Sequence, residues 1–186
     1  MANRVSALEG HYHPHRFGKE GHVGVTLTEV RDLTLHQMAG WVDTMDAVGK
    51  KGAKAVGAKE APGPCQASQG SSGAMLRIEP MKWWIYGVEA PELSPSEGAS
   101  LDMSHSRTHV RISGENAANL LNRHLPLNLS ETAFPVGSVA STAFHHVGVT
   151  LWRSDNGFEL FLPRGFALSL WEMLEAGAGQ FGAEIV

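Results

Sequence analysis

Histidines near the N-terminus are the first side chains whose spacing suggests chemistry. His11, His13 and His15 alternate, and alternate residues of an extended segment project to one side, where they could meet a metal ion. His22 follows, but a proline interrupts the run, and no cysteine or carboxylate completes a set of ligands. We therefore favour a polar arm over residues 1–22, exposed to solvent or covered by a partner. Metal binding by the three alternating histidines stays open.

Two later groups of histidines could take part in acid–base chemistry. His105 lies three residues after Asp102, and His145 and His146 fall at an expected hairpin turn. A catalytic histidine needs a reacting group within hydrogen-bonding reach and a partner that orients its ring. Closeness in sequence does not establish such a pair. We interpret these histidines as hydrogen-bonded structural or interface residues.

Cys65 is the one cysteine of the 186 residues, so no disulfide can form within the chain. It lies beside a proline in a loop expected over residues 60–73. A nucleophilic cysteine needs a lowered pKa from a nearby histidine, lysine or helix N-terminus, and the sequence places none of these beside it. A surface thiol is the preferred interpretation.

Lysines gather toward the end of an expected helix, and they are Lys50, Lys51, Lys54 and Lys59. Cations suit the negative end of the helix dipole. A phosphate or nucleic-acid role is less favoured, because no glycine-rich phosphate loop or interleaved aromatic residues accompany them.

Several common activities find no support in the sequence. It contains no Gly-x-Ser-x-Gly elbow, P-loop or Gly-x-Gly-x-x-Gly fingerprint. The net charge of −4 and pI of about 6.2 exclude a strongly basic surface for nucleic acid. No apolar run resembles a secretory signal or approaches the roughly 20 residues that span a bilayer. A cytoplasmic protein is expected.

The hydrophobic pattern predicts an α+β fold with mostly antiparallel sheet and helices packed on one face. Thr34 is a candidate N-cap for the first helix, and Asp155-Asn156-Gly157 is a strong hairpin signal. Strands are expected near 22–31, 75–78, 83–88, 110–112, 139–144, 147–152, 158–162 and 184–186, and helices over 35–56, 115–124 and 166–180.

After the arm, residues 23–186 are expected to form one domain with two subdomains, 23–88 and 101–186. A proline-containing polar connection separates them. Trp83 and Trp84 are adjacent, and a strand would point them to opposite faces. One of the two is therefore expected to face a partner.

Three separated motifs resemble the gamma subunit of heterotetrameric sarcosine oxidase in order and spacing. They are residues 102–113, the Phe-Pro-x-Gly-Ser segment within 133–138, and residues 164–171. The similarity covers about residues 74–186 and is looser over 20–60. The histidine-containing arm is not part of it.

The resemblance implies the folate-binding aminomethyltransferase fold of the glycine cleavage system, with ferredoxin-like subdomains. The shared pattern is an Asp-x-Ser, a strand and a Gly-x-x-Ala helix, here Asp102, Ser104, Gly114 and Ala117. In the aminomethyltransferases a carboxylate follows the glycine-containing strand and contacts folate. Residues 148–153 read Gly-Val-Thr-Leu-Trp-Arg and contain none, which argues against independent aminomethyl transfer.

The implied complex has alpha, beta, gamma and delta subunits. It oxidises sarcosine to glycine with oxygen and passes the one-carbon unit to tetrahydrofolate. The resemblance assigns FAD, FMN and NAD to alpha and beta and zinc to delta. It gives gamma no catalytic, cofactor-binding or metal-binding residue. Gamma is expected to pack against the folate-binding part of alpha through exposed apolar surface, with Trp83, Trp84 and Trp152 as candidates.

Three other functions stay open. The chain could be the equivalent subunit of a related complex, such as N-methylglutamate dehydrogenase. It could be a free-standing folate-binding or aminomethyl-transferring enzyme, which direct folate titration would reveal. It could also be a small metal-binding protein that uses His11, His13 and His15.

Overall fold

The computed structural model describes residues 5–186, and these form two compact units. Unit 1 combines the chain up to residue 31 with residues 106–136 and 142–186, whereas unit 2 contains residues 32–105 and 137–141. Each unit is built on its own sheet. Unit 1 is therefore assembled from three separate stretches of chain, and unit 2 is inserted between them.

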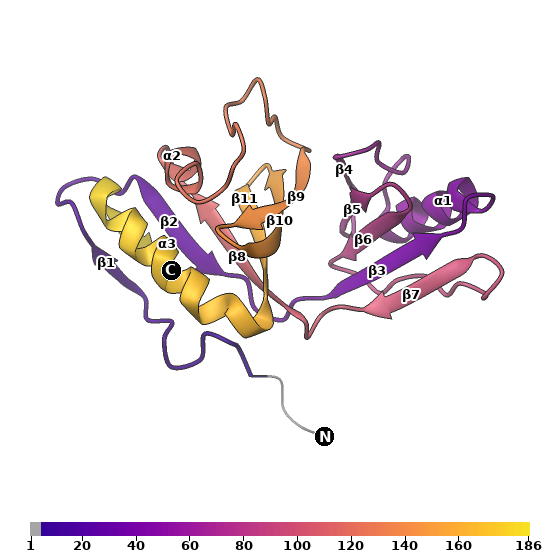
Figure 1. The fold of residues 1–186 in the computed structure, drawn as a ribbon, viewed down its shortest axis with the longest axis horizontal. Coiled ribbons are helices and arrows are strands. Elements are labelled where there is room, and N and C mark those ends of the chain that lie inside the picture. Colours follow the sequence, from indigo (N-terminus) through magenta and orange to yellow (C-terminus); the bar gives the residue numbers. More distant parts are fainter. Residues whose placement is uncertain (1–4) are drawn as a thin grey trace. The chain divides into compact units, whose positions relative to one another are not determined.

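The sheet of unit 1 has seven strands within the described residues, in the order β1-β12-β2-β8-β11-β10-β9 (Figure 1). β12 pairs in parallel with β2, and the β1–β12, β2–β8, β8–β11 and β10–β11 pairs are antiparallel. The strands are β1 (His15–Phe17), β2 (Val25–Glu29), β8 (Arg107–Ser113), β9 (Val139–Phe144), β10 (Val147–Ser154), β11 (Gly157–Pro163) and β12 (Ala183–Ile185).

The predicted hairpin at Asp155-Asn156-Gly157 is confirmed. Ser154 at the end of β10 pairs with Gly157 at the start of β11. Gly157 has φ +124°, a backbone conformation that side chains disfavour, and an added Cβ would lie 2.6 Å from the Ile112 carbonyl oxygen. Glycine is therefore required here both by the turn and by the close approach of β8.

Replacing Gly157 by alanine should lower the free energy of unfolding by about 2 kcal/mol, because strain and a backbone clash combine. Urea titration followed by circular dichroism would measure the change. Gly165→Ala is the matched control, since a Cβ at Gly165 meets no atom within 4 Å among the described residues. Equal midpoints for the two variants would contradict the prediction.

Two α-helices in the described part of unit 1 accompany its sheet. α3 (Ala167–Ala178) follows the short 3-10 turn η1 (Arg164–Phe166), precedes the 3-10 turn η2 (Gly179–Phe181), and lies across the sheet in front of β2 and β8 (Figure 1). α2 (Ala117–Leu121) packs against α3. The predicted apolar stripe of α3 is confirmed, and its buried members are Ala167, Leu170, Trp171, Leu174 and Ala178.

Unit 2 has a five-stranded antiparallel sheet in the order β4-β5-β6-β3-β7, within the part of the chain that the structure describes. One helix, α1 (Met45–Val56), packs on this sheet. The strands are β3 (Leu35–Gly40), β4 (Ala67–Gln69), β5 (Ala74–Glu79), β6 (Lys82–Tyr86) and β7 (Gly98–Asp102).

The predicted helix over 35–56 is wrong in its first part. Leu35 and Met38 are spaced as on a helix, but both are also buried in β3, which pairs with β6 and β7. The helix begins at Met45, after Thr44 rather than after Thr34. The pairing of β3 with two strands far along the chain outweighs the local pattern.

Glycines allow α1 to approach the sheet closely. A Cβ added at Gly52 would lie 2.7 Å from Met75 Cε and 3.2 Å from Ile85 Cδ1. Gly57 ends the helix with φ +74°, and the amide of Ala58 donates to the Ala53 carbonyl. The glycines that weaken the helical pattern in the sequence thus serve packing and termination.

The N-terminal segment is part of unit 1 rather than a separate arm. Leu8 is fully buried, β1 pairs with β12, and the Tyr12 ring lies 5.4 Å from that of Trp171. Residues 1–4 of the predicted arm lie outside the described residues. The units also divide the chain differently from the predicted subdomains 23–88 and 101–186, because β2 joins the sheet of β8 and β12.

The α+β class with mostly antiparallel sheet is confirmed. Among residues 5–186, no helix is long and apolar enough to cross a membrane.

Candidate functional site

A buried polar cluster in unit 1 is the strongest arrangement of chemical groups in the described residues. Glu159 on β11 lies beside His109 and Arg111 on β8 and Ser154 on β10. Its carboxylate is 2.6 Å from His109 Nε2, 2.8 Å from Arg111 Nε and 2.8 Å from Ser154 Oγ. The antiparallel register, which pairs Glu159 with Arg111, brings these side chains together.

The environment sets the charge of each member of this cluster. Burial lowers the pKa of His109, so the neutral ring donates from Nε2 to the carboxylate. Burial alone would raise the pKa of Glu159, but hydrogen bonds from His109, Arg111 and Ser154 hold it below its usual value. The cluster is therefore an ionised carboxylate with three donors.

The cluster is closed to substrates in unit 1. Glu159 and His109 are each 1% exposed, and the His109 ring stacks on Phe161 at a centroid distance of 4.5 Å. A general acid or base must reach the proton that it transfers. This arrangement is therefore suited to holding strands β8, β10 and β11 in register.

Acidification is expected to destabilise unit 1 through these two groups. Between the ordinary histidine pKa of 6.5 and the lower value of buried His109, the unfolded chain binds a proton that the folded chain does not. Glu159 adds the same effect as the pH falls below its ordinary pKa of 4.5. The free energy of unfolding should fall continuously below pH 6.5, and urea titrations from pH 7.5 to 4 would measure it. A constant or rising value would contradict the prediction.

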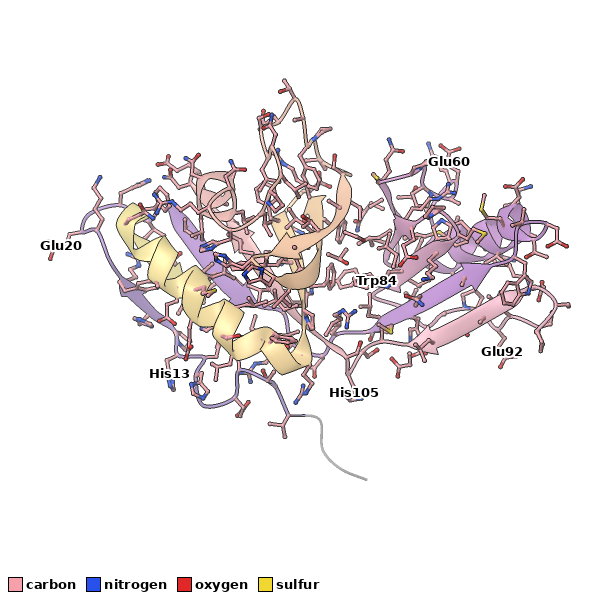
Figure 2. All side chains as sticks on the ribbon, in the orientation of Figure 1. His13, Glu20, Glu60, Trp84, Glu92 and His105 are labelled. Carbon is pink, nitrogen blue, oxygen red and sulfur yellow. The ribbon has the colours of Figure 1, made fainter. Side chains whose placement is uncertain are left out.

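Asp102 and His105 do not form a dyad. Asp102 Oδ1 accepts from the Ser104 amide at 2.8 Å, and hydrogen bonds from Ser104 lower the pKa of the Asp102 carboxyl. Ser104 Oγ lies 3.0 Å from the Leu35 amide, which donates to it. His105 is exposed (Figure 2). The Asp-x-Ser pattern therefore builds a turn after β7 and anchors it to β3.

The His145-His146 pair lies at the turn between β9 and β10, as predicted. His145 adopts φ +52°, and its Nε2 lies 3.3 Å from His124 Nδ1. The His124 ring stacks on Phe144. The pKa of His124 is lowered mainly by burial, and the nearby charges of His145 and Arg123 lower it further. This is a small aromatic and histidine cluster rather than an acid–base pair.

The N-terminal histidines make local contacts. His13 (labelled in Figure 2) has its Nε2 3.0 Å from the Gly10 carbonyl, and His15 Nδ1 lies 2.7 Å from the His13 carbonyl. His22 lies 2.9 Å from the Glu115 carboxylate. In the part of the chain that the structure describes, no three histidine, cysteine or carboxylate side chains gather as metal ligands would.

Two predictions about individual side chains have different outcomes. Cys65 is exposed, as expected for a surface thiol. The prediction that Trp83 or Trp84 faces a partner is wrong, because each is only 2% exposed although, as neighbours on β6, they point to opposite faces. Trp152 is also buried.

Exposed apolar side chains gather instead at the end of β3. Trp41 is 47% exposed and Val42 is 82% exposed. The neighbouring Met81 is also exposed, and its carbonyl accepts from the Gly40 amide at 3.1 Å. We call Trp41, Val42 and Met81 the β3-end patch. Adjacent apolar side chains that face solvent are typical of a surface that a partner covers.

A polar network holds the β3-end patch in place. Trp41 Nε1 donates to the Pro95 carbonyl at 3.0 Å, and Thr44 Oγ1 donates to the Glu97 carbonyl at 2.6 Å. The Glu97 carboxylate accepts from Lys51 and from Ser94, which lowers its pKa to about 2. The patch is therefore fixed before any partner arrives, which favours binding.

Strand β7 adds a second feature that a partner could use. It ends the order of the unit 2 sheet, and its residues 99–102 are exposed. Leu101 is among the most exposed apolar side chains of the described residues. An edge strand of this kind can accept another strand or a covering segment.

No protein-family model matches the chain. Its sequence is 30% identical to the sarcosine oxidase subunit gamma of an Arthrobacter species over 91 residues, which are 49% of this chain and 45% of the relative. The chain resembles a sarcosine oxidase gamma subunit. The predicted resemblance is thus confirmed, and the matched part spans about half the length of the curated relative.

Solved structures show the fold. A chain of the heterotetrameric sarcosine oxidase from Corynebacterium sp. U-96 superposes with a TM-score of 0.76 at 23% identity, over 89% of this chain and 88% of the other. The glycine cleavage system aminomethyltransferase T from Bartonella henselae gives 0.60 at 16% identity, over 88% of this chain and 48% of the other. The predicted aminomethyltransferase-like fold is therefore confirmed.

Residues 148–153 lie on β10, in the sheet that carries the Glu159 cluster. Trp152 is buried there, and Arg153 Nη1 donates to the Phe134 carbonyl at 2.9 Å. The segment contributes core and structural contacts to unit 1, and it holds no carboxylate.

Proposed function

We propose that this chain is the gamma subunit of a heterotetrameric sarcosine oxidase, and that it acts in assembly rather than in chemistry. The complex would oxidise sarcosine to glycine in the cytoplasm and pass the one-carbon unit to tetrahydrofolate. The observation that carries this proposal is the match in sequence to a sarcosine oxidase gamma subunit, together with a superposition that covers nearly all of the chain and of its counterpart.

The chemistry of the described residues supports the assembly role. The one dense constellation of catalytic side-chain types, around Glu159, is buried in a sheet. We therefore propose that FAD, FMN, NAD, zinc and tetrahydrofolate are held by the alpha, beta and delta subunits and that gamma supplies no catalytic residue.

The contact with alpha is proposed to run over unit 2, through the β3-end patch and the exposed strand β7. The patch is apolar, exposed and fixed by hydrogen bonds, and β7 offers a sheet edge next to it through β3. Interfaces commonly place tryptophan and methionine at their centre with a polar rim.

Affinity purification of the N-terminally tagged chain from its native cells tests the assembly proposal. We expect three co-purifying polypeptides, flavin absorbance and oxygen-dependent turnover of sarcosine. Turnover of N-methylglutamate in place of sarcosine would favour the related dehydrogenase complex. A single colourless polypeptide would overturn the proposal, and folate titration of that polypeptide would then test the free-standing enzyme.

A further inference from the structure

A cavity of about 650 Å³ lies in unit 2, between α1 and the loop at residues 57–63. The side chains of Arg77 on β5 and Trp83 on β6 contribute to its lining, and Glu60 marks the loop side (Figure 2). We call it the α1 pocket. Its volume lies within the range of small-molecule sites, and no residue of the Glu159 cluster or of the β3-end patch lines it.

Small residues give the α1 pocket an apolar wall. Gly49 and Ala53 lie on the helix, and Ala61 and Pro62 on the loop. A Cβ at Gly49 would lie 3.2 Å from the Ala61 Cβ and 3.7 Å from Trp83 Cζ2. The helix, the loop and the indole ring therefore pack directly against one another and close the pocket on its apolar side.

Cations surround this apolar wall. Lys50, Lys54, Lys59 and Arg77 line the pocket, against the carboxylates of Asp46 and Glu60. Between residues 5 and 186, no carboxylate lies within ion-pair distance of Lys50, Lys54 or Lys59, whereas Lys51 is paired with Glu97.

Lys50 and Lys54 are four residues apart on α1, so their like charges are neighbours on one helix face and destabilise the helix. Lys54 in the last turn also benefits from the helix dipole, but Lys50 is a full turn earlier. A local conflict of this kind is typical of a functional surface.

Two buried hydrogen-bond donors beside the pocket also lack acceptors. Arg77 Nε and Trp83 Nε1 are buried and have no hydrogen-bond partner among the described residues. The Arg77 guanidinium lies 5.6 Å from the centre of the Trp83 ring, and its Nη2 donates to the Pro80 carbonyl. These two atoms are closed to solvent, so the groups that a ligand with anionic oxygens would meet are the unpaired lysines that line the pocket.

We propose that the α1 pocket binds a small organic anion with an apolar body. The apolar body lies against the wall that α1 and the loop at residues 57–63 form, and the anionic group faces Lys50 and Lys54. Carboxylates, sulfonates and phosphates on an apolar body share this chemistry. The proposal is independent of the assembly role, because its residues are separate from the β3-end patch.

Isothermal titration of the full chain with naphthalene-2-sulfonate tests the proposal, with the neutral naphthalene-2-methanol as the matched ligand. We expect the sulfonate to bind at least tenfold more tightly than the alcohol, and the variant K50Q/K54Q to lose at least tenfold in affinity for the sulfonate. K51Q is the matched control on the same helix and should stay within twofold of the unchanged chain.

Circular dichroism and thermal unfolding would show whether each variant is folded. If K50Q/K54Q does not fold, the single variants K50Q and K54Q replace it, and each should lose part of the affinity for the sulfonate. No binding of the sulfonate below about 1 mM would overturn the proposal. So would equal affinity for the alcohol, or equal affinity of K50Q/K54Q and K51Q, because either result would mean binding without the pocket cations.

Discussion

Replacing Glu159 by glutamine is expected to lower the free energy of unfolding by about 3 kcal/mol. The neutral amide no longer balances the charge of Arg111, and its NH₂ group faces the His109 Nε2–H, so two donors meet where a carboxylate oxygen accepted. His109 and position 159 are each 1% exposed, and leaving a buried donor without an acceptor costs about 1–3 kcal/mol, to which the lost charge balance at the 30% exposed Arg111 adds. Urea titration at pH 7.5 would measure the change.

Glu131→Gln is the matched control for this substitution. Glu131 also pairs with an arginine, Arg153, but it is 90% exposed, so the loss should stay below about 1 kcal/mol. A double-mutant cycle that combines E159Q with His109→Gln should give a coupling energy of at least about 1 kcal/mol between His109 and Glu159. Equal effects of E159Q and E131Q would mean that the cluster does not stabilise unit 1.

The second large effect is expected on assembly. Val42→Asp should reduce the recovery of partner subunits at least about tenfold in the affinity purification, because it places a charge in the exposed apolar centre of the β3-end patch. Trp41→Ala should act in the same direction through lost contact area. Since Val42 is 82% exposed, thermal unfolding of isolated V42D should change little, whereas W41A also loses the hydrogen bond to the Pro95 carbonyl and should unfold at a lower temperature.

Val136→Asp is the matched control for the assembly prediction. Val136 is 55% exposed, and it belongs to unit 1 rather than unit 2. Normal recovery of partners with V136D and loss with V42D would assign the contact to the β3-end patch. Full recovery with both V42D and W41A would show that the contact lies elsewhere, even if the complex itself is isolated.

Sequence reasoning predicted the parts of the fold that depend on local chemistry. The β10–β11 hairpin follows from an Asp-Asn-Gly turn, and α3 follows from an apolar stripe that repeats over several turns. The strands that it missed are β1, β3, β4 and β7. Three of these, β1, β4 and β7, are edge strands with few buried residues, so no alternation marks them, and in β3 the apolar spacing also fits a helix.

The candidate sites were less predictable, because they depend on partners far apart in sequence. His109 and Glu159 are separated by 50 positions, and the one local signal was a carboxylate inside the apolar run of residues 158–162. The lysines were assigned to the end of a helix. The pocket beside them is completed by the loop at residues 57–63, and the sequence does not show that this loop folds back over α1. The exposure of Trp41 depends on where β3 ends.

The position of β12 between β1 and β2 has a consequence for biosynthesis. Early in translation, β1 and β2 leave the ribosome without the strand that joins them, and they must wait for residues 183–185. Unit 2 is nearly continuous, so its helix and sheet can form while unit 1 is still incomplete. Until β12 is synthesised, the edges of β1 and β2 that it will join stay open to wrong pairing. A chaperone that shields β2 until synthesis reaches Ala183 would therefore raise the yield of folded chain.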